Sequence, residues 1–256
     1  MKKRIFSFLL LVVVLATALL VSTSCDKNGR VSSALKKTAK LKDVDADVDT
    51  TFTINEIKYA RLTNVRRDGE NKDKPLIRIG TTISAKNTSS KTTKVFMDND
   101  TVYVPEKDNT GYTVNRAKYS SENPSLEELY YSLIKDLPDS VYDYAVSKKK
   151  KGDTYLTLTA SLTKEDFALA YSDYMNGIRK SAREQLGAEN IRFNTCHLVI
   201  KVREGYVNEL SISYDMIAFI GGTDKTVSVS TVVKLNDLKK DVDIKLPVNR
   251  DNYAKK

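Results

Sequence analysis

The segment TCHLVIKVREGYVNELSISYDM, residues 195–216, decides the fold of this chain. Its apolar side chains fall on every second position over 196–202 and again over 210–216, with Glu204 and Gly205 between the two runs. A period of two is typical of strands that cover one face, and the Glu-Gly pair is typical of a turn. The segment therefore predicts an antiparallel hairpin with one covered face and one face in water.

The same alternation recurs along most of the chain, which indicates many more strands. Further alternating runs, joined by short polar turns, lie at 44–59, 77–85, 95–104, 112–114, 156–162, 227–235 and 242–246. Near Asn55 and Glu56 the apolar positions change parity. This change predicts either a bulge or a strand with two covered faces.

Three segments show helical spacing of apolar residues instead. The longest runs over 167–186, with Thr163 as a preceding N-cap and Gly187 as a C-cap. Shorter helices are expected over 31–41 and 125–134. Strands and helices together predict an α+β fold, with an antiparallel sheet packed on two or three helices.

The first 24 residues have the layout of a bacterial lipoprotein signal peptide. A basic start, Lys2, Lys3 and Arg4, precedes a long apolar run, and small residues then lead into Cys25. We expect cleavage before Cys25 and lipidation of its thiol, with fatty acyl chains such as palmitate. Residues 25–33 then form a polar tether that holds the folded part near the membrane.

Two other interpretations of this segment stay open. Ser22 stands where such signals usually have Leu, and the apolar run 5–21 is at the short end of what spans a bilayer, so an uncleaved anchor is one alternative. Secretion with cleavage after Ala16-Thr17-Ala18 is the other, although that cut falls inside the apolar run. All three interpretations place the rest of the chain outside the cytoplasm, and the lipidated form lies on the cell membrane.

The net charge is modestly basic. It is +9 for the whole chain and falls to +6 when Lys2, Lys3 and Arg4 leave with the signal. Such an excess suits a protein held against an anionic membrane surface. Acids are interleaved with the bases and no motif of a nucleic-acid fold is present, so no nucleic-acid partner is expected.

The chain offers little catalytic chemistry. His197 is its only histidine, and Cys196 is the only thiol left once Cys25 carries lipid, so no intrachain disulfide is expected. Neighbouring side chains on a strand point to opposite faces, so we expect Cys196 in the core and His197 outside. No nucleophile elbow, phosphate loop or zinc set appears, and we expect no enzyme activity, cofactor or metal.

Two charged runs have a structural and a functional interpretation. Aspartates alternate with apolar residues over 43–49, but the glycine and glutamate of a calcium loop are absent, so a solvated strand face is favoured. A basic loop is either solvated or in contact with anionic membrane lipid or wall polymer, and it consists of Lys148, Lys149, Lys150 and Lys151.

The order of these elements resembles the LolA/LppX-like lipoproteins. Four segments look more like uncharacterised lipoproteins of Gram-positive gut bacteria: ALKKT at 34–38, VFMDNDTVYV at 95–104, VSTVVKL at 229–235 and VDIKLP at 242–247. The resemblance implies one domain over 34–248, followed by a polar tail at 249–256. It implies a curved half-barrel sheet around helices and an apolar cavity, and a role in binding or carrying lipid, but no active-site residue.

We expect a ligand to lie between the concave face of the sheet and the longest helix. The expected cavity lining is Leu158, Ala160, Leu198, Ile200, Leu210, Ile212 and Val229 from the sheet, with Phe167, Tyr171 and Tyr174 from the helix. The expected function is non-catalytic binding of a lipid or other amphiphile, driven by removal of its acyl chains from water. The alternative is a structural or signalling envelope lipoprotein that binds a protein partner and has a solid core without a ligand cavity.

Overall fold

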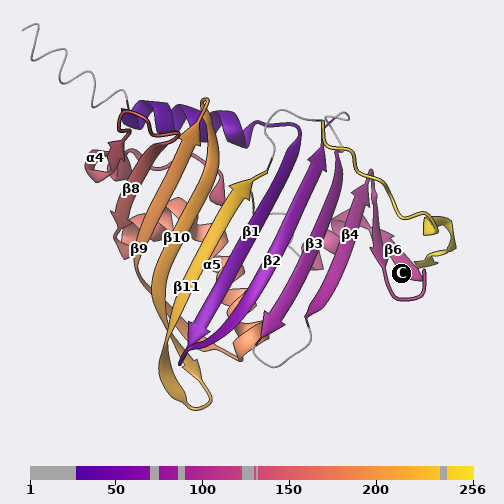
Figure 1. Ribbon diagram of the computed structural model, residues 1–256. Helices are drawn as coiled ribbons and strands as arrows, with labels where there is room; N and C mark the ends of the chain where they lie inside the picture. The colour runs from indigo at the N-terminus through magenta and orange to yellow at the C-terminus, as the bar shows by residue number, and fades with distance from the viewer. Residues whose placement is uncertain (1–26, 70–74, 86–89, 123–129, 131, 237–240) are drawn as a thin grey trace, which may run out of the picture.

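The computed structural model describes residues 27–69, 75–85, 90–122, 130, 132–236 and 241–256. These residues form one large curved sheet of twelve strands that is not closed (Figure 1). The strand order is β12-β6-β5-β4-β3-β2-β1-β11-β10-β9-β8-β7, so β12 and β7 are the edges. The strands are β1 (Val44–Ile54), β2 (Ile57–Asp68), β3 (Leu76–Ala85), β4 (Lys91–Asp98), β5 (Thr101–Pro105), β6 (Gly111–Asn115), β7 (Val146–Lys148), β8 (Leu156–Leu162), β9 (Glu189–Arg203), β10 (Tyr206–Ile220), β11 (Thr223–Leu235) and β12 (Ala254–Lys255).

Besides helical residues at 130, 132 and 133, the described part of the chain contains four helical segments, against the two or three helices expected. They are a helix over 27–39, α2 (Arg116–Glu122), α4 (Asp139–Tyr144) and α5 (Lys164–Leu186), and a short 3-10 helix, η1 (Arg250–Asn252), lies near the C-terminus. In Figure 1 the helix over 27–39 runs along one end of the strands, and α5 crosses behind them. Most of the helix expected at 125–134 falls outside the described residues.

The hairpin at 195–216 forms as predicted. β9 and β10 pair antiparallel, with Leu198 opposite Ile212, and Glu204 and Gly205 adopt positive φ angles of 53° and 79°. The alternation also places the neighbouring side chains as expected. Cys196 is buried and His197 is exposed.

The parity change at Asn55 and Glu56 marks a hairpin turn. Both residues have positive φ angles, 47° and 66°, and β2 returns antiparallel along β1 with Ile57 opposite Ile54. A two-residue turn moves the inward-facing positions from even to odd numbers, which explains the parity change. The predicted bulge, or doubly covered strand, is therefore wrong.

The C-terminal segment departs from the predicted pattern. β12 lies within the predicted polar tail and pairs parallel with β6, so the sheet is mixed and the expectation of a purely antiparallel sheet is wrong at this edge. Residues 242–246 form no strand. Instead, Val242 and Ile244 pack with Phe96 in a small apolar cluster, which explains their alternation without strand pairing.

The helix over 27–39 includes most of the stretch predicted as a tether, 25–33. The Asn28 side chain donates a hydrogen bond to the Tyr142 carbonyl at 2.9 Å, and Val31 is fully buried. These contacts order the chain from residue 27, so any tether is shorter than expected. The predicted signal peptide and Cys25 lie outside the described residues.

The longest helix, α5, has the predicted caps. The Thr163 hydroxyl accepts from the Asp166 N–H at 3.1 Å, and Gly187 adopts the left-handed conformation with φ 61°. Inside the helix, Tyr171 leaves helical geometry at φ −134° and ψ 36°, which marks a kink. In the part of the chain that the structure describes, no helix combines the length and the apolar character needed to cross a membrane.

The inner face of the sheet, which carries α5, holds two apolar clusters. The larger joins the helix over 27–39 and α5 to β8–β11 and β1. The smaller lies on β3–β6 under α2 and consists of Ile77, Ile79, Val95, Met97, Val102, Val114 and Tyr119. Among the described residues the two clusters are separate, although Val65 of β2, in the larger cluster, lies directly opposite Ile79 of β3, in the smaller one.

Candidate functional site

The ten residues predicted to line a cavity are brought together, but as a filled core. Each is at most 5% exposed, and all belong to the larger apolar cluster. The Phe167 ring centroid lies 5.0 Å from that of Tyr214 and 6.1 Å from that of Phe193. These are distances of aromatic rings in packing contact. The ligand-binding role of the ten residues stays a prediction, and side chains occupy the space between these rings.

A row of polar side chains leads out of this core toward β2. Tyr174 Oη lies 2.8 Å from Thr231 Oγ1, which lies 3.0 Å from Thr50 Oγ1. Thr231 on β11, Thr50 on β1 and Arg61 on β2 oppose one another directly in the sheet. The row therefore ends at a guanidinium group on the inner face.

Arg61 is a buried cation with one hydrogen bond. Its side chain is 8% exposed, and Nη1 donates to Ser181 Oγ of α5 at 2.9 Å. Nε has no hydrogen-bond partner, and Arg61 forms no ion pair with a described carboxylate. Burial lowers the pKa of Arg61 and the charge of Glu184 raises it, but the Glu184 carboxylate pairs with Lys180 at 4.0 Å. An unpaired buried charge is costly, so it indicates a candidate functional position.

Two kinds of residue lie beside Arg61. Two are buried threonines whose hydroxyl groups lack a hydrogen-bond partner, and two have exposed side chains. Thr63 and Thr81 oppose each other on β2 and β3, are 0% and 6% exposed, and have hydroxyl groups without a hydrogen-bond partner in the described chain. Ile83, directly opposite Arg61 on β3, is 40% exposed, and the exposed Lys91 lies opposite Ile83 on β4. We call these five residues the Arg61 margin.

The Arg61 margin was not among the predicted site residues. A signal for it is present in the sequence, because Arg61 and Thr63 have the same parity as Tyr59 and Val65 on one strand. Side chains of one parity share a face, so that parity places a cation on the covered face. The pairing with Ile83 and Lys91 depends on strand register, which the sequence pattern alone did not give.

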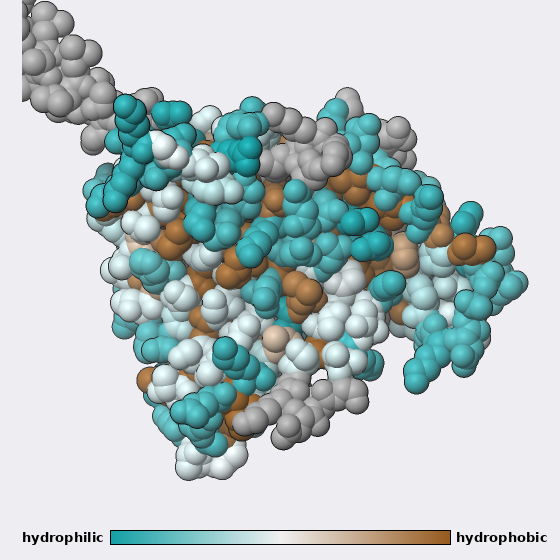
Figure 2. Space-filling view, viewed as in Figure 1, coloured by the Kyte–Doolittle hydropathy of each residue, from teal (hydrophilic) through white to brown (hydrophobic). Residues whose placement is uncertain are grey.

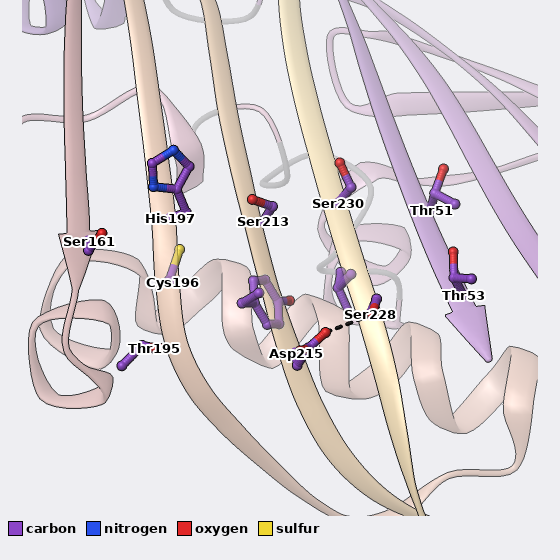
Figure 3. A pocket seen from close by; sticks show the side chains of 12 residues that line it. Thr51, Thr53, Ser161, Thr195, Cys196, His197, Ser213, Asp215, Ser228 and Ser230 are labelled. Atoms are coloured by element: carbon purple, nitrogen blue, oxygen red, sulfur yellow. Dashed lines mark hydrogen bonds between the residues drawn. The ribbon is translucent and has the colours of Figure 1, made fainter. Parts of the chain in front are cut away.

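The outer face of the sheet has a shallow hollow with a volume of about 440 Å³. Five of its residues oppose one another in turn across neighbouring strands, as Figure 3 shows: Ser161, His197, Ser213, Ser230 and Thr51. Around it the surface is mostly hydrophilic, with separate hydrophobic spots rather than one apolar patch (Figure 2). The hollow offers many hydrogen-bonding hydroxyl groups.

The same hollow shows no activated nucleophile. The Ser228 hydroxyl donates to Asp215 at 2.7 Å, so that carboxylate is hydrogen-bonded (Figure 3). Burial raises the pKa of the Cys196 thiol to about 12, although a backbone hydrogen bond from Ser213 opposes the shift. A thiol in this state is inert as a nucleophile.

The basic loop lies beside the first described helix. Lys148 ends β7 opposite Thr157, and all four predicted lysines are exposed. Lys149 lines a hollow of about 590 Å³ together with Arg30 of the helix over 27–39 and Arg203 of β9. Positive side chains therefore gather where the described chain begins. Contact of Lys148–Lys151 with anionic lipid stays a prediction.

Two aspartates of β1, Asp45 and Asp47, have protein partners on the outer face. Asp45 forms an ion pair with Arg66 at 2.9 Å, and Asp47 accepts from the Asn64 amide at 2.9 Å. Among the described residues, no group of three or more side chains of the metal-ligating types His, Cys, Asp and Glu occurs. Neither observation supports a calcium loop in this segment.

No protein-family model matches this chain, and no curated protein matches it. Among solved structures, LprF from Mycobacterium bovis is similar with 14% identity and a TM-score of 0.44, over 88% of this chain and 98% of that chain. A DUF1329 family protein from Desulfovibrio piger ATCC 29098 is similar with 10% identity and a TM-score of 0.25, over 87% and 95%. TM-scores this low establish neither a shared fold nor a function, so the LolA/LppX-like resemblance and the likeness to gut-bacterial lipoproteins stay predictions.

Proposed function

We propose that this protein is a cell-envelope lipoprotein, anchored through Cys25, that binds a lipid or other amphiphile without catalysing a reaction. The single observation that carries the proposal is the Arg61 margin. There, the exposed apolar Ile83 lies beside a buried cation and two buried hydroxyl groups without partners. An amphiphile supplies an apolar surface that covers Ile83, and polar atoms that pair with the cation and the two hydroxyl groups.

The proposed site lies between α5 and β2–β3, next to the predicted cavity rather than inside it. α5 packs mainly against β8 and β9, and it reaches β2 through the hydrogen bond between Ser181 and Arg61. A ligand chain that covers Ile83 gains about 25 cal/mol for each Å² of apolar surface removed from water, before the losses of association. Thr63 is fully buried, so the ligand displaces packed side chains when it enters.

Two matched variants test this site. Ile83→Ser removes an exposed apolar side chain from the inner face, and Leu62→Ser removes one of similar exposure, 44% against 40%, from the outer face of the neighbouring strand. Lipid that extracts into organic solvent is quantified for the full-length protein, purified gently from its membrane in detergent. We expect several-fold less lipid per protein for Ile83→Ser and an unchanged amount for Leu62→Ser.

The second candidate function is binding of a protein partner on the outer face. Leu62 and Val146 are 44% and 46% exposed there, which gives that face scattered apolar contacts for a partner. An unmodified protein that carries no extractable lipid and takes up no added labelled palmitate contradicts the amphiphile proposal. Loss of a co-purifying protein in Leu62→Ser alone then supports the partner-binding function.

A further inference from the structure

The free edge of the Arg61 guanidinium has a definite geometry. Nη1 is engaged by Ser181, so Nε and Nη2, which lie side by side on the planar group, are left for another acceptor. Two parallel N–H groups of this kind match the two oxygens of a carboxylate. The unpaired hydroxyl groups of Thr63 and Thr81, in the next row of the same face, provide further donors nearby.

We infer that the amphiphile bound at the Arg61 margin is a carboxylate with a long alkyl chain, whose headgroup pairs with the free edge of Arg61. This inference rests on the proposed function and adds the chemical class of the ligand. A carboxylate carries one negative charge, which a single buried guanidinium neutralises. A phosphate monoester carries more charge and leaves part of it buried without a partner.

The residues around Arg61 indicate where the alkyl chain of the ligand lies, as well as where its carboxylate headgroup lies. Ile83 lies directly opposite Arg61 in the sheet and Lys91 lies directly opposite Ile83, so an exposed apolar side chain separates two cations in one row. The inner face changes along this row from the buried Thr50 to the exposed Lys91. The headgroup therefore lies at the buried end, at Arg61, and the chain packs over Ile83 and removes it from water.

Three probes that differ in one feature each test this inference on the full-length protein in nonionic detergent. Carbon-13 palmitate has head and chain, carbon-13 hexadecanol has the chain without the charge, and acetate has the carboxylate without the chain. Native mass spectrometry measures the palmitate and hexadecanol adducts, and thermal unfolding measures any protection by acetate. We expect palmitate to bind the unmodified protein, hexadecanol to bind more weakly, and acetate to give no protection.

Arg61→Met removes the charge and keeps much of the side-chain volume. We expect its palmitate affinity to fall about tenfold or more, because one partner of a buried charge pair is lost, while its hexadecanol affinity is unchanged. Arg61→Lys keeps the charge without the planar fork and is expected to give an intermediate palmitate affinity. The matched control is Arg66→Met, on the same strand but ion-paired with Asp45 on the outer face, which is expected to bind palmitate as the unmodified protein does.

The outcomes separate this inference from the proposed function. If the unmodified protein binds both probes and Arg61→Met binds palmitate equally well, the carboxylate assignment is wrong and amphiphile binding stands. If the unmodified protein binds neither probe, the proposed function itself fails. Protection by acetate that depends on Arg61, without a palmitate adduct, assigns the site to a small anion and also overturns the inference. Urea unfolding of Arg61→Met checks its fold, and Arg61→Lys serves as the test if that variant is unfolded.

Discussion

At the scale of single residues, Tyr171 and Tyr174 carry the same hydroxyl group in different surroundings. Both side chains are fully buried on α5, and burial raises the pKa of both above the ordinary range, so both stay protonated. Tyr174 Oη lies 2.8 Å from Thr231 Oγ1, whereas Tyr171 Oη has no hydrogen-bond partner in the described chain. A buried polar group without a partner costs about 1–3 kcal/mol, whereas a made hydrogen bond contributes about 1 kcal/mol.

Phenylalanine substitutions at these two positions are therefore expected to have opposite effects. Tyr174→Phe should lower the free energy of unfolding by about 1 kcal/mol, and Tyr171→Phe should leave it unchanged or raise it. Urea unfolding of both variants, followed by circular dichroism, measures the difference. Equal destabilisation of the two variants contradicts the assignment of an unpaired hydroxyl to Tyr171.

Thr38 joins the first described helix to β10. Its hydroxyl donates to the Ala34 carbonyl at 2.7 Å and accepts from the Val207 N–H at 2.9 Å, and the side chain is fully buried. Thr38→Val keeps the shape but leaves that N–H without a partner, so we expect a loss of about 1–3 kcal/mol in unfolding free energy. Thr226→Val, on the exposed face of β11, is the control, and an equal effect in both variants contradicts this role.

At the scale of elements, one glycine inside α5 and the glycine that caps its C-terminus show how local backbone geometry sets stability. Gly177 lies inside the helix with open space where a Cβ would be, and Gly187 ends the helix at φ 61°. We expect Gly177→Ala to stabilise the protein by about 0.5–1 kcal/mol, because alanine loses less chain entropy on folding. Gly187→Ala is expected to destabilise it by about 1 kcal/mol, since alanine disfavours the left-handed region. Thermal unfolding of both variants measures the two effects, and a shift in the same direction contradicts the assignment.

The contact of the helix over 27–39 with the segment before α4 predicts a pH dependence. Burial acts to raise the pKa of Asp136, but hydrogen bonds from Lys36, Tyr142 and Ser32 outweigh it and hold the pKa below its ordinary value of 3.8. A lowered pKa stabilises the fold above pH 3.8, and this contribution is lost as the pH falls below that value. Asp136→Asn should therefore be less stable than the unmodified protein at neutral pH, by a difference that shrinks in acid.

Urea unfolding at several pH values checks this dependence. Asp143→Asn, an exposed position on α4, serves as the control and is expected to follow the unmodified protein at every pH. A difference between Asp136→Asn and the unmodified protein that is constant from neutral to acid pH contradicts the proposed role of the Asp136 charge.

The elements that the sequence predicted correctly are those with strong local signals. The β9–β10 hairpin has a regular period and a turn pair with positive φ, and α5 has a cap at each end, Thr163 and Gly187. Two of the errors fall where pairing or packing between distant segments decides the structure, whereas the hairpin turn at Asn55 and Glu56 is a local feature that was wrongly predicted as a bulge or a doubly covered strand. β12 is two residues long, and more than half of the sequence separates it from its partner strand β6. The alternation of Val242 and Ile244 arises because both side chains pack against Phe96 and not because they form a strand.

At the scale of the whole molecule, the fold is one open sheet whose inner face holds two separate apolar clusters. The predicted cavity residues were placed on the correct face, because period and parity define faces. Whether they enclose space or fill it depends on side-chain size and on where α5 crosses the strands, which periodicity does not give. The candidate site at Arg61 can be recognised only from the strand register, which places Thr50 on one side of Arg61 and Ile83 on the other.

The central claim is that an amphiphile binds on the inner face at the Arg61 margin, and photochemical crosslinking tests it most directly. Palmitate with a diazirine group in its chain is bound to the full-length protein, illuminated, and located by mass spectrometry of the peptides. We predict labels on β2, β3 and the C-terminal half of α5, with weaker labelling in Ile83→Ser than in Leu62→Ser. Labels confined to the outer face, or no labelling at all, contradict the claim.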